Sequence, residues 1–110
     1  MSDYQFISID KELIPYKFDI TLSGRTFTIE INYNAMRDFF TINLLRDEIS
    51  VVIGEKIVYG RLLFLNQQHL DVPTVPIIPY DLSLTENRVT WENLNNTVFL
   101  WLPNGGLEDG

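Results

Sequence analysis

A strict alternation of apolar and polar residues between positions 16 and 33 is the feature that most limits what this chain can fold into. Apolar side chains occupy every second position of 16–22, and after Ser23-Gly24 they do so again in 27–33. A period of two is typical of a strand with one buried face, and a turn dipeptide between two such runs indicates a hairpin. The sequence therefore predicts a β-hairpin in this region.

The position of the turn also predicts the register of that hairpin. Centring the turn on Ser23-Gly24 gives three apolar pairs on one face: Tyr16 with Ile31, Phe18 with Ile29, and Ile20 with Phe27. The other face then carries three polar pairs: Lys17 with Glu30, Asp19 with Thr28, and Thr21 with Thr26. A slip of one residue would set polar side chains against apolar ones along the whole hairpin, so this register is well specified.

Two further strands extend the hairpin into a meander. A loop over 34–39 lets Phe40, Ile42 and Leu44 face the apolar side of the preceding strand. A second loop over 45–48 is expected to return three more apolar residues to the same face: Ile49, Val51 and Ile53. From 49 to 65 apolar residues are denser, which predicts strands covered on both faces, as in a closed barrel or a sandwich.

Prolines at every third position set the segment 71–79 apart. Pro73, Pro76 and Pro79 favour an extended, polyproline-like path and exclude a central strand. An SH3-type ligand would normally carry a basic flank, whereas this segment begins at Asp71. The better interpretation is a structural strap that crosses the barrel or runs along a partner.

The last apolar run, 98–102, is predicted to be a strand with two apolar faces. Phe99 and Trp101 share one face, while the alternate residues Val98, Leu100 and Leu102 share the other. This pattern indicates either full burial or a surface reserved for a partner. As an apolar edge strand, it would also favour self-association of the isolated chain.

Together these patterns predict an all-β fold. We expect a small antiparallel β-barrel or curled sheet of six to eight strands, built on the N-terminal meander. Thr90 is placed to cap one short helical turn near 91–95, and no other helix is expected. At 110 residues the chain fits a single β-rich domain, 1–110, with an N-terminal segment at 1–13 and a flexible acidic tail at 103–110.

Composition excludes several classes of function. The formal charge is −7 and the eight Lys and Arg residues are dispersed, which argues against nucleic-acid binding. The chain has no cysteine, so neither disulfides nor thiolate metal sites can form. The apolar runs are far shorter than a membrane span, and the N-terminus lacks the features of a signal peptide.

Candidate catalytic residues are few. His69 is the only histidine and lies in a polar stretch, so a loop role is expected for it. Asp38 and Asp81 fall in predicted turns, where aspartate commonly caps the backbone. No nucleophile elbow and no phosphate-binding glycine loop is present. We therefore expect no catalytic residue, no metal and no cofactor.

Several blocks of sequence, in order, resemble a known family. The blocks are Ile14-Pro15-Tyr16, Tyr33-Asn34, Asp38-Phe39-Phe40, Gly54 to Phe64, Pro76 to Leu82, Val89-Thr90, Asn93-Leu94 and Val98-Phe99-Leu100. From about 14 to 102 the chain resembles the baseplate plug family of contractile-tailed phages and prophages. The resemblance implies a virion structural protein at the tail tip, made in the cytoplasm of the bacterial host. It implies contacts with hub, tube or neighbouring tail subunits, and neither an enzyme activity nor a cofactor.

The interface hypothesis combines the proline strap with the last strand. Its predicted contact residues are Pro73, Pro76, Pro79, Tyr80, Phe99 and Trp101. A stand-alone module for a carbohydrate or a peptide is the alternative, and exposed aromatic side chains lining a groove would favour it. A small hydrolase would require Asp38, Asp81 or His69 to converge in one pocket.

Overall fold

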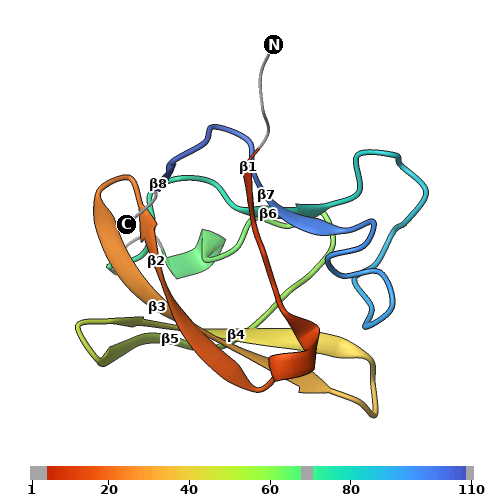
Figure 1. The fold of residues 1–110 in the computed structure, drawn as a ribbon, viewed down its shortest axis with the longest axis horizontal. Coiled ribbons are helices and arrows are strands. Elements are labelled where there is room, and N and C mark those ends of the chain that lie inside the picture. Colours follow the sequence, from red (N-terminus) through yellow and green to blue (C-terminus); the bar gives the residue numbers. More distant parts are fainter. Residues whose placement is uncertain (1–4, 68–70, 109–110) are drawn as a thin grey trace.

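A computed structural model describes residues 5–67 and 71–108, and it shows the all-β fold that the sequence predicts (Figure 1). The strands are β1 (Gln5–Ile7), β2 (Tyr16–Leu22), β3 (Arg25–Asn34), β4 (Phe39–Arg46), β5 (Ile49–Lys56), β6 (Ile78–Tyr80), β7 (Phe99–Leu102) and β8 (Leu107–Glu108). Two 3₁₀ turns accompany them, η1 (Lys11–Leu13) and η2 (Leu65–Gln67).

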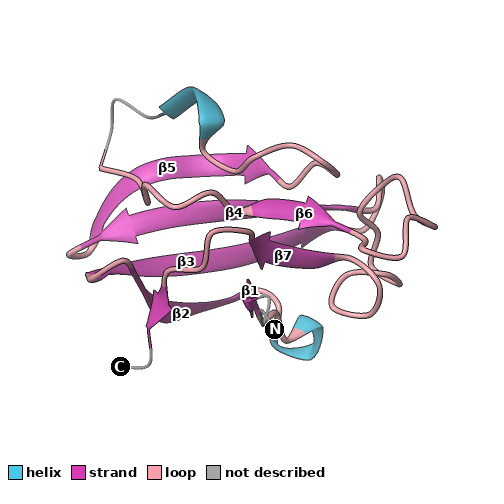
Figure 2. Ribbon diagram, turned by 90° about the horizontal axis from the view of Figure 1, so that it is seen from above, coloured by secondary structure: helices cyan, strands magenta, loops and turns pink. Residues whose placement is uncertain are grey.

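The strands form two antiparallel sheets that are not closed into a barrel. The large sheet has the order β5-β4-β3-β2-β8, and the small sheet has the order β1-β7-β6. Their apolar faces meet in one core, with the large sheet on one side and the small sheet on the other (Figures 1 and 2). The barrel prediction is therefore wrong, because the chain leaves the large sheet after β5 and builds a second sheet.

The meander from β2 to β4 has the predicted register. β2 and β3 pair through the six residue pairs named above, including Ile20 with Phe27 and Lys17 with Glu30. β3 and β4 then pair Tyr33 with Phe40 and continue in that register. The turn and the period-two pattern were sufficient here because each strand pairs with its neighbour in sequence.

The prediction for β5 is wrong in register. Ile49 and Ile53 are exposed and Val51 is half-buried, whereas Val52 is buried opposite Leu44. The pairing of β4 with β5 shifts twice, so the inward position moves by one residue. Gly54 stabilises the irregular stretch, with a left-handed φ of 73° and an N–H that donates to Asn43 Oδ1 at 2.7 Å.

This register makes a testable distinction between two neighbouring residues. Val52→Ala should lower the free energy of unfolding by about 2 kcal/mol, because it removes two buried methyl groups. Ile53→Ala should change it by about 0.5 kcal/mol or less, because that side chain is 74% exposed. Urea denaturation of the two variants measures the difference. A larger loss for Ile53→Ala would contradict the shifted register.

The proline strap is held within the chain. Asp71 pairs with Arg25 and Arg46, whose guanidinium groups each lie 5.3 Å from the ring of Phe27 in the core. At the other end, the N–H of Gly60 donates to the carbonyl of Pro79 at 2.7 Å. The strap therefore joins the two sheets and ends in β6, which is an edge strand as proline requires.

Both terminal segments contribute strands to the sheets. β7 lies between β1 and β6, so it is a central strand and its edges are already paired. The expectation of self-association through this strand therefore loses its basis. Residues 107–108 pair with β2, and Leu107 packs against the core, whereas the flexibility of the tail 103–110 stays a prediction. The last two residues of the predicted tail lie outside the described residues.

The predicted helical turn is present as one capped turn. The N–H of Leu94 donates to the carbonyl of Thr90 at 3.0 Å, and the Thr90 hydroxyl accepts the Asn93 N–H at 3.2 Å. The 3₁₀ turns η1 and η2 were not predicted. Asp10 caps the first of them by accepting the Glu12 N–H.

Candidate protein-contact face

The outer face of the small sheet carries a row of aromatic side chains. Alternation along β7 turns Leu100 and Leu102 into the core and leaves Phe99 and Trp101 half-buried on the opposite side. The neighbouring strands bring matching residues beside them. In register, Phe6 of β1 pairs with Trp101, and Tyr80 of β6 pairs with Phe99.

These rings contact one another in defined geometries. The centroid of Phe6 lies 4.7 Å from that of Phe99 and 5.4 Å from that of Trp101. Trp101 Nε1 donates to the carbonyl of Tyr80 at 2.9 Å, and Tyr80 stacks on Tyr59 at 5.3 Å. We call Phe6, Tyr59, Tyr80, Phe99 and Trp101 the outer aromatic face. These side chains pack against one another in the protein by itself.

A hollow of about 200 Å³ adjoins this face. Its lining is entirely apolar or aromatic and consists of Ile78, Tyr80, Leu82, Trp101 and Pro103. Leu82 at its rim is 51% exposed. A hollow of this size and chemistry can receive an apolar side chain of another protein, as the central pockets of interfaces do.

The structure brings together half of the predicted contact residues. Tyr80, Phe99 and Trp101 lie on the outer aromatic face, whereas Pro73 and Pro79 are buried within the chain's own fold. Pro76 is half-buried in the strap. The chain itself therefore covers two of the predicted contacts, and the interface role of the others stays a prediction.

Sequence reasoning missed Phe6. The segment 1–13 was set aside as an N-terminal extension, and its three-residue strand is too short to show a convincing alternation. The signal that could have found it is the apolar pair Phe6 and Ile7, one of which must face away from the core in any extended strand.

Asp38 supports local structure. Its Oδ1 accepts the Tyr33 hydroxyl at 2.6 Å and the Trp91 N–H at 2.8 Å. The Tyr33 hydrogen bond and then the Trp91 N–H hold the pKa of Asp38 below its usual value, and the same carboxylate raises the pKa of Tyr33. The carboxylate thus ties the β3–β4 end of the large sheet to the loop around Trp91.

The Asp81 carboxylate also supports local structure, in the turn that follows β6. It is buried, and its two oxygens accept hydrogen bonds from the backbone or hydroxyl groups of Ser83, Thr85 and Glu86 at 2.6–2.9 Å. The Ser83 hydroxyl contributes most to the lowering of the Asp81 pKa. The hydrogen bonds described for the Asp38 and Asp81 carboxylates have no partner in common, and His69 lies outside the described residues.

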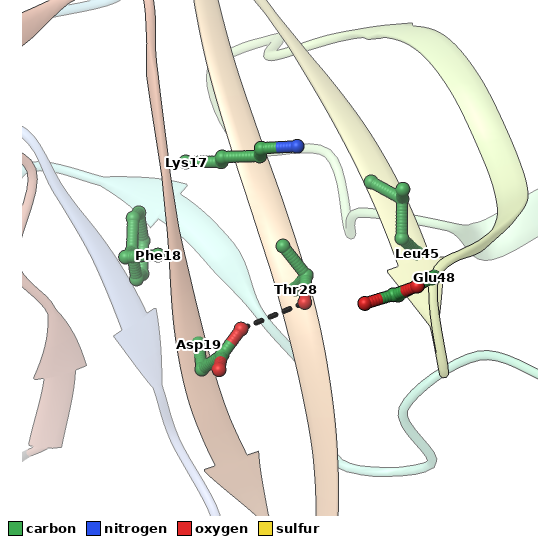
Figure 3. A pocket seen from close by; sticks show the side chains of 6 residues that line it. All are labelled: Lys17, Phe18, Asp19, Thr28, Leu45 and Glu48. Carbon is green, nitrogen blue, oxygen red and sulfur yellow. Dashed lines mark hydrogen bonds between the residues drawn. The ribbon is translucent and has the colours of Figure 1, made fainter.

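A second hollow, of about 490 Å³, lies on the outer face of the large sheet (Figure 3). It is lined by Lys17, Phe18, Asp19, Thr28, Leu45 and Glu48. The Thr28 hydroxyl donates to Asp19 Oδ1 at 2.7 Å across the hairpin, as the dashed line shows. Mixed charges over the exposed side of strands are the usual solvated face of such a sheet, and they form no recognisable site.

Two kinds of feature are absent from the described residues. Within 5–67 and 71–108, no three His, Asp or Glu side chains lie together where they could hold a metal ion. In the same part of the chain, no helix is long and apolar enough to cross a membrane.

Comparison with known proteins assigns the family. No curated protein was found to match the chain. Residues 4–104 match the family described as "Cyanophage baseplate Pam3 plug gp18". This match spans nearly the whole chain and both sheets of the fold. The chain therefore belongs to the family of the cyanophage Pam3 baseplate plug gp18, which gives it a structural role in a phage baseplate.

Proposed function

We propose that this protein is a baseplate component of a phage or prophage tail that acts through contacts with neighbouring tail proteins, such as hub or tube subunits. The contacts are made by the outer aromatic face and the adjoining hollow. Family membership supports the location. The observation that carries the contact proposal is the group of Phe99, Trp101 and Phe6 rings on the outside of the small sheet.

Two physical properties suit this face to binding. Tryptophan and tyrosine are enriched among the residues that dominate interface energies, because each buries a large apolar area and keeps one polar group for orientation. The rings are also held in place in the unbound protein, because Trp101 Nε1 donates a hydrogen bond to the Tyr80 carbonyl and the Trp101 ring packs against Phe6. Fixed side chains lose little conformational entropy when a partner binds.

We also propose that the protein is not an enzyme and takes no cofactor. The carboxylates that the sequence offered for catalysis, Asp38 and Asp81, already accept short structural hydrogen bonds. Both have lowered pKa values, which is the opposite of the raised pKa that a general acid needs at neutral pH.

A binding module for carbohydrate is the competing function, because Tyr80 and Trp101 could stack on a sugar ring. The hollow between them is lined only by apolar and aromatic side chains. Sugar specificity requires hydrogen-bonding groups in the site as well as ring faces. The lining therefore favours an apolar protein side chain over a glycan.

A lysine at the rim of the hollow tests the proposal. Leu82→Lys places a charge where the partner's apolar side chain would lie, so we expect the affinity for the neighbouring baseplate protein to fall at least roughly tenfold. The measurement is co-elution of the chain with the products of the adjacent tail genes, followed by titration of the pair that forms a complex.

Leu84→Lys is the matched control. Leu84 is 70% exposed and lies two residues away, outside the lining of the hollow. It should bind as the unmodified chain does. The contact proposal fails if no tail protein co-elutes, or if both lysine variants bind with unchanged affinity. Glycan binding that Leu82→Lys abolishes, without any protein complex, would establish the competing function.

A further inference from the structure

A third hollow, of about 140 Å³, lies beside the outer aromatic face. Two cationic side chains, Lys56 and Arg88, line it together with Asn87 and the rings of Phe39 and Tyr59. We call this site the basic hollow. The chain carries 15 Asp and Glu residues against eight Lys and Arg, yet none of the described Asp and Glu residues lines this hollow. It is therefore a positive site on an acidic protein.

The basic hollow is continuous with the outer aromatic face through two stacked rings. Tyr59 lines the basic hollow, and Tyr80 lines the 200 Å³ hollow beside Trp101, which we call the apolar hollow. The two tyrosine rings lie 5.3 Å apart, 22° from parallel, and the Tyr59 hydroxyl accepts the Asp81 N–H at 3.1 Å. The strands that precede them, β5 and β6, point toward the same side of the molecule (Figure 2). One partner can therefore contact both hollows at once.

The ammonium group of Lys56 has no carboxylate partner among the described residues. It lies 4.5 Å from the Phe39 ring, on the aromatic wall of the hollow. The preceding residue, Glu55, pairs with the buried Ile42 and so faces the opposite side of the strand. There Glu55 Oε2 accepts the Phe64 N–H at 2.8 Å. The charge of Lys56 is thus available to a partner.

The guanidinium group of Arg88 is held in place and keeps part of its surface exposed. Its Nη2 donates to the carbonyls of Arg37 and Asp38 at 3.5 and 3.2 Å. The Asp38 carboxylate lies 3.9 Å from Nη1, and its Oδ1 already accepts hydrogen bonds from Tyr33 and Trp91. The Arg88 side chain is 58% exposed. A guanidinium group has five N–H donors, so donors remain for a second carboxylate.

We propose that the basic hollow binds an Asp or Glu side chain of the same baseplate protein whose apolar side chain enters the apolar hollow. This inference deepens the proposed function and rests on it. Charge complementarity selects the carboxylate. At about 0.15 M salt the screening length is about 8 Å, so two cations in the hollow outweigh the net charge of −7 that is spread over the chain. An apolar contact is non-directional, and a second, charged contact fixes the orientation of the partner.

Reversing the charge of the hollow tests this inference. Lys56→Glu should weaken binding to the tail protein that co-elutes with the unmodified chain at least roughly tenfold, because like charges then meet. Lys56→Gln removes the charge without reversing it and should weaken binding by roughly twofold to fivefold. Arg88→Glu should behave as Lys56→Glu does. If loss of the Arg88 hydrogen bonds unfolds that variant, Lys56→Glu still decides the test.

Lys17→Glu is the matched control, because it makes the same change in net charge. Lys17 is exposed on β2 and lines neither the basic hollow nor the apolar hollow. This variant should bind within roughly twofold of the unmodified chain. Titration at about 0.05 M and about 0.5 M salt adds a second measurement. The affinity of the unmodified chain should fall more steeply with salt than the affinity of Lys56→Gln, because salt screens the ion pair that Lys56→Gln lacks.

A reciprocal change in the partner identifies the carboxylate. The acidic residues of the co-eluting protein are replaced one at a time by lysine, and each product is titrated with Lys56→Glu. One replacement should restore the affinity to within roughly threefold of the unmodified pair, because opposite charges then face each other again. The inference is overturned if no replacement restores binding, or if Lys17→Glu weakens binding as much as Lys56→Glu does.

The two proposals fail in different ways. If Leu82→Lys abolishes binding and Lys56→Glu leaves it unchanged, the proposed function stands and the inference about the basic hollow is wrong. If no tail protein co-elutes with the chain, the proposed function fails and this inference fails with it.

Discussion

Phe40→Ala should lower the free energy of unfolding by about 3–5 kcal/mol, a large part of the roughly 5–15 kcal/mol that stabilises a domain. Phe40 is fully buried in β4, opposite Tyr33 in the register. Its ring lies 4.8 Å from that of Tyr33 and stacks at 6.0 Å, 12° from parallel, on Trp91. Truncation leaves a cavity between the large sheet and the loop around Trp91, which the surrounding strands cannot close.

Phe39→Ala is the control for this prediction, because it removes the same side chain from the adjacent position on the opposite face. Phe39 is half-buried, and its ring faces the ammonium group of Lys56. Its loss should cost about 1 kcal/mol or less. Urea denaturation with a common m-value compares the two variants. Equal losses would show that the face assignment of β4 is wrong.

Asp81→Asn should lower the melting temperature by roughly 5–10 °C at pH 7. Both oxygens of Asp81 accept hydrogen bonds, two at Oδ1 from Ser83 and three at Oδ2 from Thr85 and Glu86. An asparagine side chain has one acceptor oxygen, so its NH₂ group must face either the Ser83 donors or the donors of Thr85 and Glu86. Asp47→Asn is the matched control, because Asp47 is exposed in the β4–β5 turn. The melting temperature of this variant should hardly change.

The effect of Asp81→Asn should also depend on pH. Hydrogen bonds hold the folded-state pKa of Asp81 below the unfolded value of about 3.9. The contribution of the carboxylate to stability is therefore complete above about pH 4 and is lost as the pH falls toward the folded-state pKa. The difference in melting temperature between the two proteins should narrow between about pH 4 and pH 2. An equal difference at pH 7 and pH 2.5 would contradict this account.

Local pattern was enough to predict the pairing and the buried faces of β2, β3 and β4, and the two faces of β7. The alternation along β2, β3 and β4, with its turn at Ser23-Gly24, predicted the pairing that the structure shows. The same reasoning identified β7 as a strand with two apolar faces and placed Phe99 and Trp101 together. Both results depend on residues that are close in sequence, where the period and the turn restrict the register.

The sequence could not predict the neighbours of strands that pair over long distances. β7 pairs with β1, almost one hundred residues earlier, and this pairing places Phe6 beside Trp101. Alternation tells which side chains share a face, but it carries no information about which strand lies alongside. The shifts at β5 are similar, because one of them lies near Gly54, whose N–H donates to Asn43 Oδ1 on the facing strand.

The alternation between 16 and 33 thus determined a hairpin, its register and its buried face, because period and turn act locally. Tertiary structure alone decided that the meander would be one sheet of two and not part of a closed barrel. It also decided that β5 would be an edge while β7 became a central strand. These outcomes depend on how the two apolar faces cover each other, which is a property of the assembled core and not of any one segment.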